Sequence, residues 1–207
     1  MIEIELKAHL DDYMPVKERL SVVGDYCRSY KKSDSYWLPA QPAAAGDIIA
    51  GGRIAEMSIP PSGVRVRREN GIDADGVAHE FVLATYKTKE ISGGIEVNHE
   101  CEFTVSDAGL FEELLGRLGL NRAVRKEKEG WAWTIPSQSA GQSPILAELS
   151  LVAGLGWFLE IEILAANDSE QTVKESRERL FALLEKLEIP SEWIESRPYT
   201  AMLRERR

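Results

Sequence analysis

The chain opens with Met1-Ile-Glu-Ile-Glu-Leu-Lys7, in which apolar and charged residues alternate. This period of two predicts a β-strand, because successive side chains of a strand point to opposite faces. The charged face carries Glu3, Glu5 and Lys7, and the apolar face carries Ile2, Ile4 and Leu6. Taken alone, the pattern is typical of an edge strand whose charged face meets water. The alternative is a charged face that points inward, and it depends on whether other strands repeat the pattern.

Composition narrows the class of protein. The chain has 207 residues, of which 43% are hydrophobic and 29% charged, with a formal net charge of −9. These values predict a globular protein with one core, and we expect one domain over residues 1–207. The negative charge argues against nucleic acid or an anionic membrane as the main partner, although a local basic patch can still bind an anion.

The two cysteines, Cys27 and Cys101, lie far apart and form no CxxC pair. We expect two reduced thiols in a cytoplasmic protein, with one long-range disulfide as the alternative. The first residues carry Glu3 and Glu5 where a signal peptide needs basic and apolar residues. The longest uncharged apolar run, 149–159, is too short to span a bilayer.

Helices and strands are predicted from apolar periodicity. A helix is expected after Asp11 and Asp12, a second over 106–119, and a third from Asp168 or Ser169 to Pro190. In the second helix we expect Leu110, Phe111, Leu114, Leu115 and Leu118 to point inward. Strands are expected around 33–37, 63–68, 80–89, 95–105, 124–134, 145–151 and 157–164. Residues 39–63, rich in Ala, Gly and Pro, read as a loop insertion.

Most of these strands carry charged residues of one sign two positions apart. The acidic pairs are Glu3/Glu5, Glu100/Glu102 and Glu160/Glu162, and the basic pairs are Arg65/Arg67 and Lys126/Lys128. On a set of solvent-exposed faces we would expect mixed signs within each strand. The segregation favours a closed sheet whose charged faces line one interior, since opposite walls can then neutralise each other.

Facing acidic and basic walls suit a polyanion that is accompanied by divalent cations. Carboxylates bind Mg²⁺ or Mn²⁺ and leave positions for water and phosphate oxygens. Arginine donates paired hydrogen bonds to phosphate, and lysine supplies a point charge. Phosphoryl transfer depends mainly on positioning and charge neutralisation, which such an interior could supply.

The charged strands resemble those of the CYTH superfamily, which groups class IV adenylyl cyclases with thiamine triphosphatases and related triphosphatases. The matching motifs cover most of the chain in the family's order. They are Glu3-Ile-Glu5-Leu-Lys7, Asp34-Ser-Tyr36, Arg65-Val-Arg67, Thr85-Tyr-Lys87, Glu100-Cys-Glu102, Lys126-Glu-Lys128 with Trp131, Leu155-Gly-Trp-Phe-Leu-Glu160-Ile-Glu162 and Tyr199-Thr-Ala-Met-Leu203.

The resemblance implies an α+β protein built on an eight-stranded antiparallel β-barrel, the triphosphate tunnel fold, with flanking helices. It implies catalytic roles for Glu5, Lys7, Glu160 and Glu162. It implies substrate-binding roles for Lys7, Arg65, Arg67, Lys87, Lys126 and Lys128. The candidate ligands of Mg²⁺ or Mn²⁺ are Glu3, Glu5, Glu100, Glu102, Glu148, Glu160 and Glu162.

Two positions depart from the family's pattern. Ser150 stands where the family has an Asp ten residues before the final Glu-x-Glu, and Asn98 stands where an Arg is common. Glu148, two residues before Ser150 on the same face, could supply the missing carboxylate. Otherwise one metal site would be weakened.

The first functional hypothesis is a class IV-type adenylyl cyclase, which converts ATP to cyclic AMP and pyrophosphate. The alternative is a triphosphatase that hydrolyses inorganic triphosphate, thiamine triphosphate or a nucleotide. A third hypothesis, suggested by Ser150, is a triphosphate sensor without turnover. A lipocalin-like carrier is disfavoured because its interior would be apolar. The expected partner is the triphosphate, and we expect neither nucleic acid nor a membrane as a partner. A homodimer is a further hypothesis.

Overall fold

We describe a computed structural model of the chain, covering residues 2–39, 63–92, 95–137 and 141–206; the side chains of 87–92, 95, 96 and 99 lie outside the description. The predicted insertion therefore falls outside the described residues, except for Pro39 and Gly63. From the N-terminus onward, the described part of the chain forms β1 (Ile2–Leu10), α1 (Met14–Val23), β2 (Asp25–Pro39), β3 (Val64–Asp73), β4 (Ala78–Ser92), β5 (Ile95–Thr104), α2 (Ala108–Arg117), β6 (Leu120–Ile135), β7 (Ile145–Val152), β8 (Gly156–Ala165), α3 (Glu170–Lys186), the 3₁₀ turn η1 (Ser191–Trp193) and α4 (Tyr199–Glu205).

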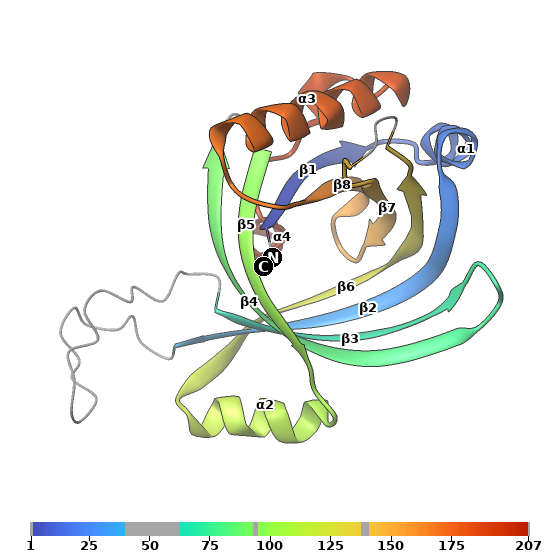
Figure 1. Cartoon of the computed structure of the whole chain (residues 1–207). Coiled ribbons are helices and arrows are strands. Elements are labelled where there is room, and N and C mark those ends of the chain that lie inside the picture. Colours follow the sequence, from blue (N-terminus) through green and yellow to red (C-terminus); the bar gives the residue numbers. More distant parts are fainter. Residues whose placement is uncertain (1, 40–62, 93–94, 138–140, 207) are drawn as a thin grey trace.

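The strands of the described residues form one closed antiparallel barrel in the order β1-β5-β4-β3-β2-β6-β7-β8 (Figure 1). The first strand closes the ring, because β1 pairs with β5 on one side and with β8 on the other. The predicted eight-stranded antiparallel barrel with flanking helices is confirmed. Three strands run well beyond their predicted limits, namely β2, β3 and β6, and β2 pairs with β6 along most of its length.

The main hydrophobic core lies outside the barrel, between its outer wall and the helices. Helix α3 packs across β1 and β8, at the top of Figure 1. Ile4 and Leu6, on the apolar face of β1, are almost fully buried there. The same core contains Leu149 of β7, Leu159 and Ile161 of β8, and Leu180, Leu184 and Leu187 at the end of α3. Burial of the outward face fixes the register, so the charged face of β1 must point into the barrel.

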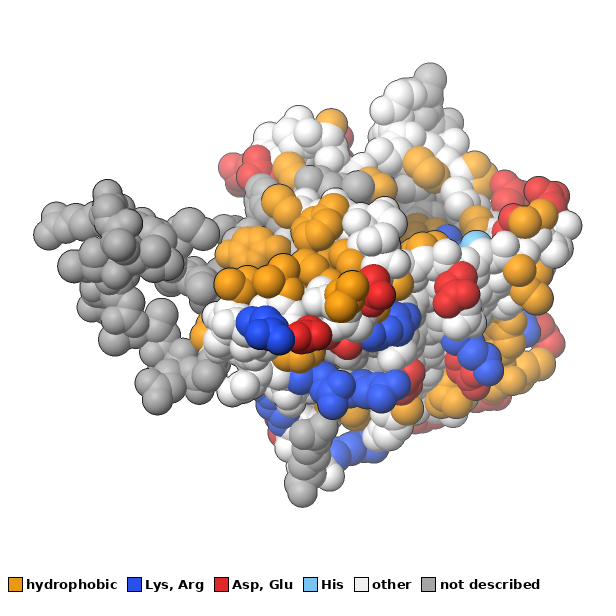
Figure 2. All heavy atoms as spheres, turned by 90° about the horizontal axis from the view of Figure 1, so that it is seen from below, with side chains coloured by type: hydrophobic (Ala, Val, Ile, Leu, Met, Phe, Trp, Pro, Cys, Tyr) orange, Lys and Arg blue, Asp and Glu red, His pale blue; other side chains and the backbone are white. Residues whose placement is uncertain are grey.

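Helix α2 packs against the opposite side of the barrel, but with fewer residues than predicted. Ala108, Phe111 and Leu115 pack onto side chains of β2, β3, β4 and β6. Leu110, Leu114 and Leu118 are 67%, 48% and 66% exposed, so their predicted inward position is wrong. The helix contacts the barrel wall through one narrow side only, as far as the described residues show. The leucines on its other side are therefore exposed. Figure 2 shows hydrophobic side chains gathered on the face of the molecule that α2 occupies.

The apolar face of β5, which points away from the cavity, is also more exposed than the alternation of apolar and polar residues predicts. Cys101 is exposed, and Phe103 is 55% exposed although its ring has an edge contact with that of Phe111. Among the described residues, α2 reaches this part of the strand through the Phe111 ring and leaves most of the face uncovered, which explains the exposure. Cys101 and Cys27 are free thiols, as predicted.

The close approach of β6 to β7 depends on Gly130. A Cβ atom at this position would lie 2.0 Å from the carbonyl oxygen of Leu149. We therefore expect Gly130→Ala to lower the free energy of unfolding by about 1–3 kcal/mol, the usual cost of overpacking. Urea unfolding followed by circular dichroism measures this change.

Gly116→Ala is the matched control for this substitution. Gly116 lies in α2, where, among the described residues, an added Cβ atom would come no closer than 4.0 Å, to the Trp37 ring. Alanine is favoured over glycine in a helix by about 1 kcal/mol, so this variant should be as stable as the parent or slightly more stable. Equal effects of the two substitutions would contradict the packing argument.

Candidate active site

The barrel encloses a cavity of about 670 Å³ that all eight described strands and α4 line. Its walls carry most of the predicted site residues: Glu3, Glu5, Lys7, Arg65, Arg67, Glu100, Glu102, Lys126, Lys128, Glu148, Glu160 and Glu162. The remaining one, Lys87, has a side chain outside the description, although its backbone pairs with that of Glu100. Charged pairs that lie up to about 160 positions apart in sequence thus share one interior because the sheet closes on itself.

Carboxylates gather where β1, β8 and β7 are neighbours. Glu5 lies opposite Glu162 in the register of β1 and β8, and Glu160 lies opposite Glu148 in that of β7 and β8. Burial, together with the negative charges of Glu148 and Glu5, raises the pKa of Glu162 to about 8. The neighbourhood of Glu162 is therefore short of positive charge.

The chemistry of these donors fits a divalent metal ion. Carboxylate oxygens are the ligands that Mg²⁺ and Mn²⁺ prefer, and a cation would relieve the crowding that raises the pKa of Glu162. Among the described residues, no three His, Cys, Asp or Glu side chains are already arranged as a metal-binding group. A bound ion would therefore complete its coordination with water or with oxygens of a ligand, as Mg²⁺ commonly does.

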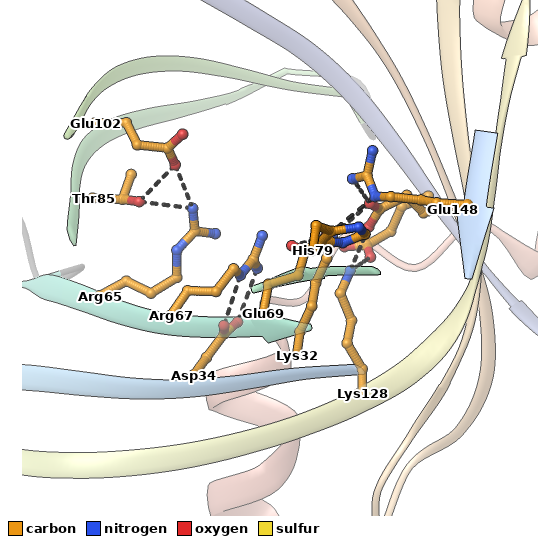
Figure 3. Close-up of polar contacts among 12 residues, drawn as sticks. Lys32, Asp34, Arg65, Arg67, Glu69, His79, Thr85, Glu102, Lys128 and Glu148 are labelled. Carbon is orange, nitrogen blue, oxygen red and sulfur yellow. Dashed lines mark hydrogen bonds and ion pairs between the residues drawn. The ribbon is translucent and has the colours of Figure 1, made fainter. Parts of the chain in front are cut away.

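Cations form the facing wall, and Asp34 holds two of them in place; Figure 3 shows one of these contacts, with Arg67. Arg67 donates two hydrogen bonds to the Asp34 carboxylate, at 2.7 and 3.0 Å, and Lys126 lies 3.1 Å from it. Asp34 is fully buried. Burial opposes its ionisation, but Arg67 and Lys126 outweigh burial and hold the pKa of Asp34 well below its usual range.

Arg65 has weaker partners. Its guanidinium donates to the Thr85 hydroxyl at 2.9 Å and to Glu102 at 3.4 Å, and the Glu102 side chain is about one-third exposed (Figure 3). An anion that enters the cavity could replace the Glu102 carboxylate on Arg65 more readily than it could replace the buried Asp34 on Arg67.

A third group of charges surrounds Glu148. Lys32 lies 2.5 Å from its Oε1 atom, and Lys128 lies 3.0 Å from its Oε2 atom (Figure 3). Lys128 also contacts Glu160. Burial of the ammonium group lowers the pKa of Lys32 to about 8, although Glu148 opposes the decrease. Burial also opposes the ionisation of Glu160, yet Lys128 and Lys126 lower its pKa to about 2.

Ser150, the departure from the family's Asp, is fully buried and is not among the residues that line the cavity. Glu148 does line it, as predicted for a substitute carboxylate. Both of its oxygens, however, accept hydrogen bonds from lysine ammonium groups. Asn98, the second departure, is fully buried opposite Glu3 in the register of β1 and β5.

The C-terminal helix covers one end of the cavity. The Tyr199 ring of α4 lies 4.4 Å from Lys7 Nζ and 4.8 Å from Lys126 Nζ. Its other side packs edge-on against Phe158, within a small apolar cluster that includes Met202. Lys7 also donates a hydrogen bond of 2.6 Å to the carbonyl of Arg197. The chain end thus fixes the lysine that the opening strand contributes.

Apolar side chains also line the cavity, at strand positions that pair with carboxylates. Leu146 lies opposite Glu162, Leu164 opposite Glu3, and Phe81 opposite Glu69 in their strand registers. All three face the cavity. The cavity wall therefore carries apolar surface beside its carboxylates.

Sequence reasoning missed four charged residues of the cavity wall: Arg28, Lys32, Glu69 and Arg204. Two of them could have been found by extending the alternation, because Lys32 precedes Asp34 by two positions and Glu69 follows Arg67 by two. Arg204 belongs to α4, where no strand periodicity points to the barrel.

The fold and this cavity define a class of protein, a closed antiparallel barrel that encloses facing carboxylates and cations. The CYTH domain model matches residues 60–199, and the chain belongs to the CYTH family. A Methanocaldococcus jannaschii protein named "Putative adenylate cyclase MJ0240" is 27% identical over 187 residues, which cover 88% of this chain and 90% of that protein.

Solved structures share the fold along the whole chain. The PH1819 protein of Pyrococcus horikoshii has a TM-score of 0.73 at 23% identity and covers 99% of both chains. A Hippeastrum protein, HpAC1, has a TM-score of 0.61 at 14% identity over 100% of this chain and 96% of its own. HpAC1 is described as a "putative adenylyl cyclase" with a dominant triphosphatase activity.

The importance of Asp34 can be tested by removing its carboxylate. Asp34→Ala would leave Arg67 and Lys126 without their buried partner, and breaking a buried ion pair in this way costs about 3–5 kcal/mol. We expect a loss of unfolding free energy of this size in urea titrations. Asp25→Ala, on an exposed position of the same strand, should change stability little. A similar small effect at both positions would show that Asp34 does not hold the basic wall.

Proposed function

We propose that the protein is a divalent-metal-dependent enzyme that acts on a triphosphate bound in the barrel, with ATP cyclisation to cyclic AMP and pyrophosphate as its reaction. The observation that carries this proposal is the single cavity whose walls combine Glu5, Glu160 and Glu162 with Arg65, Arg67 and Lys126. A triphosphate needs cations along its length and a divalent ion to neutralise its charge during the reaction.

In this proposal the basic residues bind and orient the phosphates. Arg65 and Arg67 offer paired N–H donors, and Lys7, Lys87, Lys126 and Lys128 add positive charge. Glu3, Glu5, Glu160 and Glu162 would hold Mg²⁺ or Mn²⁺, with Glu100, Glu102 and Glu148 as further acidic candidates. When bound, the metal ion would supply charge neutralisation and lower the pKa of a hydroxyl group that it contacts.

The proposed cyclisation forms a bond between the ribose 3′-oxygen and the α-phosphorus. The bond from that phosphorus to the bridging oxygen breaks, its electron pair leaves with pyrophosphate, and the proton of the 3′-hydroxyl passes to solvent water or to the leaving pyrophosphate. The cations of the basic wall would stabilise the charge on the leaving pyrophosphate. Leu146, Leu164 and Phe81 supply apolar surface in the same cavity, which suits an organic group attached to the triphosphate.

Hydrolysis of a triphosphate is the second candidate. The same walls would serve a water molecule that attacks the terminal phosphorus, and HpAC1, which shares this fold, is described as mainly a triphosphatase. The organic group could then be thiamine or a nucleoside, or it could be absent in inorganic triphosphate. A sensor without turnover is the third candidate.

The products decide among these candidates. The protein is incubated with Mg²⁺ or Mn²⁺ and, separately, with ATP, thiamine triphosphate and tripolyphosphate, and the products are separated by ion-exchange chromatography. We expect cyclic AMP and pyrophosphate from ATP. Orthophosphate without cyclic AMP would replace the cyclase by a triphosphatase. Tight triphosphate binding without any product would leave only the sensor.

The carboxylates can be tested by isosteric amides. Glu5→Gln and Glu162→Gln keep the shape of each side chain but remove the charge that would hold the metal ion, so each should reduce metal-dependent turnover at least about 100-fold, in line with the loss of a metal-site interaction. Glu129→Gln, an exposed glutamate of β6, is the control and should keep full activity. Unchanged turnover in both cavity variants would overturn the assignment.

The location and the partners follow from the same proposal. No helix in the described part of the chain is long and apolar enough to cross a membrane. Two free thiols and a net charge of −9 support a cytoplasmic enzyme whose partner is a small triphosphate rather than nucleic acid or a membrane. The homodimer stays a prediction.

A further inference from the structure

The acidic wall has two parts that differ in how their charge is balanced. Glu148 and Glu160 lie beside lysine ammonium groups, whereas Glu162 lies opposite another carboxylate, Glu5, in the register of β1 and β8. Two divalent ions bound side by side would need carboxylates from both parts. An ion can bind beside Glu148 only if an oxygen of that carboxylate is accessible and the charges nearby can accommodate two further positive charges.

Lysine ammonium groups already occupy both oxygens of Glu148. Lys32 Nζ lies 2.5 Å from Oε1, and Lys128 Nζ lies 3.0 Å from Oε2. Metal ions approach carboxylate oxygens along the same lone-pair directions that these hydrogen bonds use. An ion that bound Glu148 would therefore have to displace at least one ammonium group.

Lys32 is fixed in this position from several sides. Its side chain is only 3% exposed, and its Nζ atom lies 3.5 Å from Glu69 and 4.2 Å from the centre of the Tyr30 ring. In the barrel its backbone pairs with Glu69 on one side and Lys128 on the other. A displaced Lys32 ammonium would have to remain buried without its strongest partner, which is costly.

The charges around Glu148 are also balanced without a metal ion. The cations Arg28, Lys32 and Lys128 face the anions Glu69, Glu148 and Glu160, with each member of one set within 4 Å of at least one member of the other. Three positive charges thus meet three negative charges. A divalent ion added at this place would create an excess of positive charge in a buried region.

We propose that the Lys32 ammonium takes the place of a second divalent cation, so that the tunnel binds a single Mg²⁺ or Mn²⁺ beside Glu5 and Glu162. This inference rests on the proposed metal-dependent function. It gives Glu148 a different role from that of a metal ligand, because its carboxylate holds Lys32 and Lys128 in position. Lys32 is thus a positioning and charge-balancing residue.

The test counts metal ions in the protein without substrate. Mn²⁺ is titrated into the parent chain and into Lys32→Met, with free Mn²⁺ followed by electron paramagnetic resonance and heat by calorimetry. We expect one bound Mn²⁺ per parent chain and two per Lys32→Met chain, because the variant removes the ammonium group from Oε1 of Glu148 and leaves an uncompensated negative charge.

Lys31→Met is the matched control. Lys31 is the neighbouring residue of β2, but its side chain is 72% exposed and pairs with Glu129 at 3.3 Å on the outer face. This variant should bind one Mn²⁺, like the parent. Two Mn²⁺ ions per parent chain, or one per folded Lys32→Met chain, would overturn the proposal. Should Lys32→Met fail to fold by circular dichroism, Lys32→Gln keeps a polar side chain beside Glu148 and carries the same expectation.

Turnover of ATP and tripolyphosphate is measured on the same samples, so that the two proposals can fail separately. One bound Mn²⁺ in the parent and two in Lys32→Met, without turnover, would support this inference and refute the enzymatic function. Turnover by a parent chain that holds two Mn²⁺ ions would support the function and overturn this inference.

Discussion

Charge balance inside the barrel is the condition on which the rest of the structure depends. The inward faces of the strands are charged, and an isolated buried charge would cost more than the fold could offset. Asp34 between Arg67 and Lys126, and Glu148 between Lys32 and Lys128, show how the opposite charges of neighbouring strands meet this condition. The apolar residues must then stabilise the fold from outside, which places the main core between the barrel wall and α3.

The same balance prepares the interior for a polyanion. Acidic partners hold the side chains of the basic wall in position before any ligand binds. Binding therefore costs little side-chain conformational entropy. The partners differ in strength: Asp34 is fully buried and bound twice by Arg67, whereas Glu102 is partly exposed and lies 3.4 Å from Arg65. A ligand can therefore compete for Arg65 while Asp34 keeps Arg67 in position.

Residues of the first strand and of the last helix contact each other at one end of the cavity. Lys7 from the opening strand donates to the carbonyl of Arg197, and the Tyr199 ring of α4 lies against the same ammonium group. The apolar cluster of Phe158, Tyr199 and Met202 supports the helix there. Leu146 and Leu164 lie at positions next to Glu162 and Glu3, so the cavity offers apolar surface beside its carboxylates.

The sequence by itself determined which residues of each predicted strand share a face, because successive side chains of a strand point to opposite faces. Glu3, Glu5 and Lys7, first read as the solvated face of an edge strand, face the cavity, as the repeated pairs and the CYTH motifs predicted. The sequence did not determine how much of each apolar face is buried. Exposed apolar side chains include Leu110, Leu114 and Phe103, because periodicity does not show how much of a face a neighbouring element covers.

Only the tertiary structure decided which charges neutralise which. Lys32, Glu69 and Glu148 come from three strands, and their contacts depend on the order in which β2 pairs with β3 and β6 and on side-chain reach across the barrel. The sequence shows a glutamate two residues before Ser150 but not the ammonium groups on both of its oxygens. Alternation is a local property of each strand, whereas the pairing of buried charges arises only when the barrel closes.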